Sequence, residues 1–168
     1  MRNLFKLALP VAALGLVLFV APAARAVTDT ANQTVGATVS PYASLSIDSA
    51  TVTFANADPT TASIDATEGA LGITADARTT TAGAVTLTVV ADGDLTSGSD
   101  SIDISNLTWV KTGTGYVAGT MSKTTPQTVA TRTGSGTLNG TISYKLANSL
   151  SYATGSYSAS LLYTLTAP

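Results

Sequence analysis

Near its C-terminus the chain reads YSASLLYTL, residues 157–165, in which apolar and polar side chains alternate. Alternation with a period of two is typical of a β-strand that has one buried face. Shorter stretches of this kind lie at residues 35–39, 43–47, 52–54, 85–89 and 142–146, and a strand or strand pair with a shift of phase spans 102–109. No window has the 3.6-residue apolar period of an amphipathic helix, so the chain is predicted to be all-β.

Clusters of Gly, Asp and Asn separate these stretches and predict turns. The strongest is Asn139-Gly140, which predicts a two-residue hairpin because both central residues of that turn need a positive φ. Asp92-Gly93-Asp94 and Gly113-Thr114-Gly115 mark two more loops. About eight to ten short antiparallel strands at this spacing predict a single immunoglobulin-like, Greek-key β-sandwich. A barrel is the alternative, but its strands are usually more regular in length.

The first residues have the features of an export signal. Arg2 and Lys6 precede an apolar run, Leu7 to Val20, and the small residues of Ala24-Arg25-Ala26 follow it. This order predicts a cleavable signal peptide over residues 1–26. The apolar run is shorter than the ~20 residues that a membrane-spanning helix needs.

Cleavage after Ala26 leaves a mature domain of residues 27–168, and cleavage after Ala23 is the alternative. No second apolar run of comparable length follows. We therefore expect an exported protein at the cell surface, in the extracellular space or in the periplasm, and not integral to the membrane.

The sequence contains no histidine and no cysteine. It therefore lacks the residues for Ser-His-Asp or Cys-His catalysis, for His-ligated metals and for disulfides. After residue 26 it has ten acidic and five basic residues, a balance that argues against nucleic-acid binding. All ten acids precede Ile104 and four of the five bases follow it, which predicts an interaction surface unless the two halves interleave in space. We expect neither an enzyme nor a bound cofactor.

One acidic cluster is a candidate calcium site. Asp92, Asp94, Asp100 and Asp103 place carboxylates along a turn-like stretch. Calcium prefers such oxygen ligands, but the spacing departs from that of an EF-hand loop and no Glu closes it. A solvated acidic turn is the alternative interpretation.

Three aromatic residues are candidates for binding or assembly: Trp109, Tyr157 and Tyr163. Trp109 is the only tryptophan. It has two interpretations, an anchor of the core or an exposed platform for sugars and cell-wall polymer.

The C-terminal stretch 157–168 resembles the closing strand of WxL domains, which are cell-wall-associated domains of Gram-positive bacteria. Tyr163 stands where that family has its second Trp, and Leu107-Thr108-Trp109 is similar to the approach to the first motif. Residues 44–54 resemble the family's first strands. The resemblance implies a β-rich surface domain that binds peptidoglycan or other surface proteins.

The chain also resembles chaperone–usher pilin subunits, because Gly155 lies where those proteins have a Gly before their last alternating strand. In that family an N-terminal segment of alternating apolar residues completes the fold of a neighbour. Val35, Ala37 and Val39 are either such a donor or an ordinary first strand. The sequence thus predicts a structural or wall-binding surface protein, with a self-assembling fimbrial or matrix subunit as the alternative.

Overall fold

The computed structural model describes residues 25–168, so the predicted signal peptide lies almost entirely outside the described residues. The chain divides into two units, Met1–Ala37 and Thr38–Pro168. In the described part of the first unit, residues 25–37, there is no helix or strand and every side chain is exposed. The interpretation of residues 35–39 as an ordinary first strand of the sandwich is therefore wrong for the single chain.

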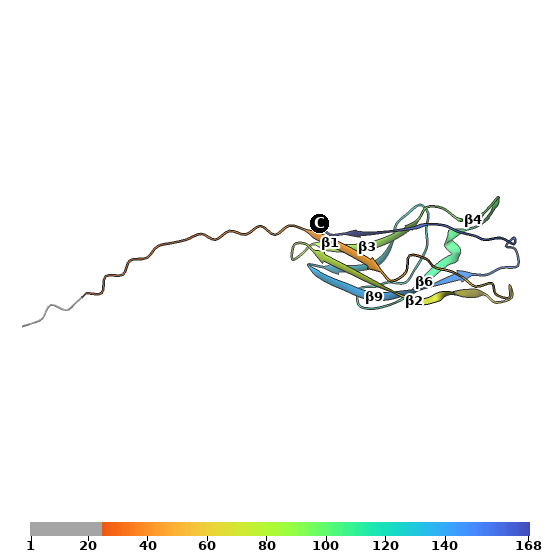
Figure 1. Ribbon diagram of the computed structural model, residues 1–168, viewed down its shortest axis with the longest axis horizontal. Coiled ribbons are helices and arrows are strands. Elements are labelled where there is room, and N and C mark those ends of the chain that lie inside the picture. The colour runs from red at the N-terminus through yellow and green to blue at the C-terminus, as the bar shows by residue number, and fades with distance from the viewer. Residues whose placement is uncertain (1–24) are drawn as a thin grey trace, which may run out of the picture. The chain divides into compact units, whose positions relative to one another are not determined.

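The second unit is a β-sandwich (Figure 1). The strands of its larger sheet run in the order β1 (Tyr42–Ile47), β2 (Ser63–Arg78), β9 (Gly136–Ala147), β6 (Leu107–Thr112) and β7 (Gly119–Thr120). The smaller sheet has the order β10 (Leu161–Thr166), β3 (Ala84–Ala91) and β8 (Gln127–Thr133). A hairpin of β4 (Leu95–Ser97) and β5 (Asp100–Ile102), and a short 3₁₀ turn, η1 (Ile104–Asn106), lie between β3 and β6.

All strand pairs in residues 25–168 are antiparallel, which confirms the predicted all-β sandwich class. No helix in that range is long and apolar enough to cross a membrane.

The core lies between the two sheets and is built from alternating side chains. In β3, Val85, Leu87 and Val89 are completely buried while Thr86 and Thr88 face outward. This alternation is why the sequence predicted β3 correctly, because successive side chains of a strand point to opposite faces. The two largest fully buried side chains, Trp109 and Tyr144, come from the other sheet.

The predicted hairpin at Asn139-Gly140 is wrong, because both residues lie inside β9. Gly140 does not form a turn; the absence of a side chain there lets Tyr116 and Thr112 O lie close to its backbone. A Cβ atom on Gly140 would lie 2.6 Å from ring carbons of Tyr116 and 2.5 Å from the carbonyl oxygen of Thr112. Glycine within a strand often marks a place where another group comes this near.

The long strand β2 was not predicted at all. Its inward positions at one end are the small residues Ala75 and Ala77, and its register against β9 shifts between Asp65 and Ala70. Gly69 lies in this irregularity with φ of 69°, a conformation that suits glycine. The bulge breaks the alternation of the strand and so removes the signal on which the prediction depended.

Candidate functional site

The two lateral edges of the sandwich differ, and the difference begins with the backbone of β8. The outer edge of β8 is covered by the segment 113–121, which links β6 to β7 and continues past it. Val117 N–H donates to Val129 O (2.9 Å), and Thr131 N–H donates to Gly115 O (2.9 Å). We call this side, formed by β8 and residues 113–121, the closed edge.

Side chains seal the closed edge as well. Tyr116, Met121 and Val129 are each at most 2% exposed. The Tyr116 hydroxyl donates to Ile73 O across the core (2.7 Å), and burial raises the pKa of that phenol. Gly115 and Gly113, both at positive φ, give segment 113–121 the turn that brings Tyr116 inward.

The opposite side of the sandwich lies between β1 and β10, each of which is the outermost strand of its sheet. Within residues 25–168 no hydrogen bond joins β1 to β10, although the two strands are neighbours. Figure 1 shows the start of β1 near the end of β10 and the C-terminus. The backbone groups that point outward from these two strands thus lack a strand partner in the described chain.

The inward side chains of β1 and β10 are only partly covered. We call these five side chains the open seam: Leu45, Ile47, Leu161, Tyr163 and Leu165. They pack against the core, but each keeps part of its surface exposed. Their register partners on β2 and β3 are at most 3% exposed, so the exposure comes from the missing neighbour at the edge: Ala75, Ile73, Ala91, Val89 and Leu87.

Tyr163 lies in the open seam, and its hydroxyl forms a hydrogen bond with the Tyr144 hydroxyl of β9. This contact ties β10 to the opposite sheet. Burial raises the pKa of both phenols above the ordinary value, and the effect is larger for Tyr144, which lies deeper. Tyr163 was proposed from the sequence as an assembly residue. In the structure its side chain is partly exposed and packs against the core as part of the open seam.

The other two aromatic candidates have different positions. Trp109 is 2% exposed and its indole N–H donates to Val117 O (2.9 Å). Of its two interpretations, this position fits the anchor of the core. The indole ring also packs over Gly119, where a Cβ atom would lie 2.3 Å from a ring carbon. Tyr157 is partly buried before β10, and its hydroxyl donates to Ala153 O (2.9 Å).

The four acidic residues of the candidate calcium site are not brought together. Asp92 accepts from Ser160 N–H, Asp94 from Ile104 N–H, and Asp103 from Ser105 N–H, while Asp100 begins β5. No group of three acidic side chains in residues 25–168 is arranged to hold a metal ion. In the described chain, Asp92, Asp94 and Asp103 thus accept hydrogen bonds from backbone N–H groups of nearby segments.

The unequal charges of the two halves of the sequence interleave in the fold. Lys123 pairs with Asp94 (2.5 Å) and Lys145 pairs with Asp65, so two late bases meet two early acids. The hydrogen bond from Lys123 lowers the pKa of Asp94. The charge asymmetry therefore does not by itself define a patch.

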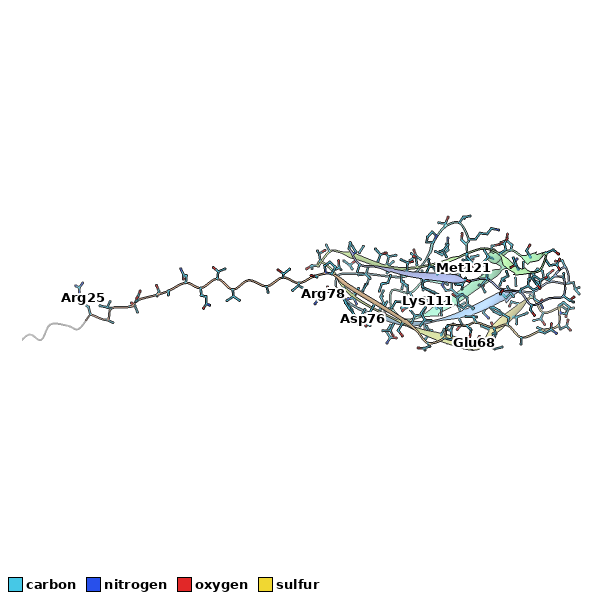
Figure 2. All side chains as sticks on the ribbon, turned by 45° about the horizontal axis from the view of Figure 1, so that its top comes forward. Arg25, Glu68, Asp76, Arg78, Lys111 and Met121 are labelled. Carbon is cyan, nitrogen blue, oxygen red and sulfur yellow. The ribbon has the colours of Figure 1, made fainter. Side chains whose placement is uncertain are left out.

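The described surface has a shallow hollow at one end of the sandwich. This hollow, of about 470 Å³, is lined by residues that include Tyr42, Asp76 and Arg78. Figure 2 shows Asp76 and Arg78 at this end of the sandwich. Arg78 there donates through Nε to Ser40 O (2.8 Å), and Asp76 accepts from the Thr137 hydroxyl (2.5 Å). Arg78 and Asp76 thus hold the start of β1 and the start of β9, which gives these polar side chains a structural role.

Sequence reasoning found Tyr163 but missed the four aliphatic residues of the open seam. Their alternation was visible, yet alternation does not reveal whether a strand ends up at an edge, because that depends on pairing between distant segments. This side offers partly exposed apolar side chains and main-chain groups without a strand partner in the described chain. Comparisons with protein families, with curated proteins and with solved structures find no match for this chain.

Proposed function

We propose that the protein is an exported, non-catalytic structural subunit of the cell surface that assembles with copies of itself. The single observation that carries the proposal is the open seam between β1 and β10. An uncovered strand edge above an apolar core is a template for pairing with another chain, and proteins usually protect such edges with charges, bulges or covering segments. Here the closed edge has a covering segment, and β10 (LLYTLT) has no charged residue.

The absence of reactive groups supports a structural role. The sequence offers no His or Cys for nucleophilic or metal chemistry. The described carboxylates that have hydrogen-bond partners accept from backbone N–H groups, hydroxyls or lysines, both in loops and within strands. Export would place such a subunit where fimbriae, matrices and wall-associated layers form.

Sedimentation of the mature chain, residues 27–168, over a wide range of concentrations tests the proposal. We expect oligomers whose size grows with concentration. A variant without residues 27–39 should keep its β circular dichroism spectrum and stay monomeric, since the sandwich strands begin at Tyr42. A mature chain that remains monomeric at every concentration would contradict self-assembly.

A wall-binding module is the other role that an exported sandwich of this kind fits. Co-sedimentation with purified peptidoglycan distinguishes the two roles. A monomeric protein that pellets with peptidoglycan would replace the assembly proposal with wall binding, and a protein that assembles but stays in the supernatant would support assembly.

A further inference from the structure

We infer that the outer face of the smaller sheet binds ordered water, in the arrangement that water has at the surface of an ice crystal. The part of this face that carries the inference, the threonine face, consists of six outward side chains of β3, β8 and β10: Thr86, Thr88, Thr128, Thr131, Thr164 and Thr166. It lies on the side of the smaller sheet that faces away from the core and the open seam. The inference therefore goes beyond the proposed function and does not depend on self-assembly.

Strand pairing lines the six threonines up in two rows that cross the sheet. One row is Thr166, Thr86 and Thr131, and the other is Thr164, Thr88 and Thr128. Neighbouring strands lie about 4.8 Å apart and alternate residues of one strand about 6.7 Å apart, so the rows form a two-dimensional lattice of hydroxyl and methyl groups. Both distances are close to repeat distances between the oxygen atoms of ice.

A bulge in β8 keeps the two rows aligned. Thr128 and Thr131 are three residues apart, and in a regular strand residues at this spacing point to opposite faces. The register between β3 and β8 shifts next to Thr88, and the two residues between the threonines, Val129 and Ala130, are both fully buried. The extra residue of the bulge therefore returns Thr128 to the outer face, opposite Thr88.

The groups on the threonine face are both available and preorganised. Each threonine hydroxyl can donate and accept hydrogen bonds, and the β-branched side chain restricts rotation about χ1. In the described chain one of the six hydroxyls has a protein partner: Thr88 donates to Thr164 O at the long distance of 3.5 Å. The hydroxyls can thus take the place of water molecules in a lattice, while the methyl groups restrict the orientation of the water beside them.

The threonine face carries no charge, unlike the outer face of the larger sheet. Strands β3 and β10 contain no charged residue, and in β8 the Arg132 guanidinium donates to the carbonyl oxygens of Ser135 and Thr137 in the following turn and strand. The outer face of the larger sheet has Asp76 and Lys145 in its central strands. An ammonium group holds a strong hydration shell of its own, so the uncharged face is the better match for a water lattice.

The shape and composition of this face favour ice over a sugar ligand. Sites for small organic molecules are usually concave and lined by apolar and aromatic side chains. None of the outward positions of β3, β8 and β10 in the described chain carries an aromatic residue. A regular array on a sheet surface instead matches a ligand that is itself a regular surface.

Two lysine variants at matched positions test the inference. Thr164→Lys with Thr166→Lys places two charges on the threonine face of the edge strand β10. Ser44→Lys with Ser46→Lys, the control, places the same charges on the exposed outer face of the other edge strand, β1. Each chain, residues 27–168, carries a fluorophore at its N-terminus and is diluted until sedimentation shows monomers. Ice is then grown slowly in the solution, and the fluorescence of ice and liquid is compared.

We expect the natural chain and the Ser44/Ser46 variant to be enriched in the ice, and the Thr164/Thr166 variant to be enriched at least about tenfold less, since its ammonium groups keep their own hydration shells. Circular dichroism checks that each variant folds. If the lysines on β10 prevent folding, Thr164→Ser with Thr166→Ser replaces them; it keeps the hydroxyls, loses the methyl groups and should lower the enrichment about threefold, because serine rotates more freely about χ1.

Three results would overturn the inference: exclusion of the natural chain from ice, an equal loss of enrichment in both lysine variants, or retention of the natural chain by crystalline cellulose or chitin without entry into ice. The last would assign the face to a polysaccharide. Each of them leaves self-assembly standing, because the measurement uses monomers. A chain that enters ice but never assembles would overturn the proposed function and support the inference.

Discussion

The closed edge and the open seam are two solutions to the same problem, a sheet that ends. On the β8 side, a segment close in sequence folds back, pairs with the strand and inserts Tyr116 and Met121 into the core. On the β1–β10 side, the strands belong to the two ends of the domain, and no segment of the described chain comes between them. The comparison teaches that the chain covers one edge of the sandwich with its own backbone, whereas the other edge keeps backbone groups without a strand partner in the described chain.

The largest effect expected from this difference is on assembly. If residues 35–39 are the donor that the resemblance to pilin subunits implies, Val35→Asp combined with Val39→Asp should weaken oligomer formation by at least about 100-fold, because two charges would enter an apolar seam without partners. The melting temperature of the monomer should not change, since both side chains are exposed in the single chain. Sedimentation equilibrium and a thermal melt measure the two quantities.

The matched control for this variant is Thr34→Asp combined with Thr38→Asp. It adds the same charge to the other face of the segment, which is directed away from the seam if the segment pairs as a strand. Equal loss of assembly in both variants would show that net charge, and not coverage of the seam, controls association.

The next effect compares the two edges within the monomer. Met121, labelled in Figure 2, lies at the closed edge and is 2% exposed. Met121→Ala should lower the free energy of unfolding by about 3 kcal/mol, because it leaves a cavity in the core. Leu165→Ala, in the open seam, should cost only about 1 kcal/mol because part of that side chain is already exposed. Urea unfolding of a monomeric form without residues 27–39 measures both, and equal losses would show that the seam is as well packed as the closed edge.

A substitution at Gly140 should have a smaller effect on the free energy of unfolding, and it tests whether contact with Tyr116 holds the closed edge in place. Gly140→Ala should cost about 2 kcal/mol, because the new methyl group meets the Tyr116 ring and Thr112 O and must push segment 113–121 outward. Gly93→Ala is the control, since a Cβ atom there has nothing within 4 Å, and its effect should stay within about 0.5 kcal/mol. A tolerated Gly140→Ala would mean that Tyr116 does not hold the edge closed.

These particulars show which parts of the structure were predictable from the sequence. The β-class and the strands β1, β3 and β10 followed from local alternation, since their inward residues are large and apolar. Strand β2 did not, because alanines and the bulge at Gly69 hide its period.

Local sequence also misled at Gly140 and could not reveal the seam. The Asn-Gly pair fits a tight turn, but both residues pair with β2 inside β9, Asn139 with Thr74 and Gly140 with Ile73. Whether β1 and β10 lie at an edge is decided by pairings across the whole chain. The expected export and surface location stay predictions.

The smallest effect concerns the phenols of Tyr144 and Tyr163, which tie β10 to the opposite sheet. Both pKa values are raised in the folded state, mainly by burial, whereas in the unfolded chain tyrosine ionises near pH 10. The folded state therefore holds protons that the unfolded state releases, so stability is intact below about pH 10 and falls as the pH rises above it. Urea unfolding of the monomer near pH 8 and near pH 11 should show this loss.

Replacing both tyrosines by Phe should change the free energy of unfolding at neutral pH by no more than about 1 kcal/mol, because the two hydrogen-bonded hydroxyls are removed together. The double variant should also lose less stability at high pH. Tyr42→Phe, at an exposed position, should leave the loss unchanged. If the double variant loses as much stability at high pH as the natural chain, other groups control the alkaline transition and the tyrosine pair is not what holds β10 in place.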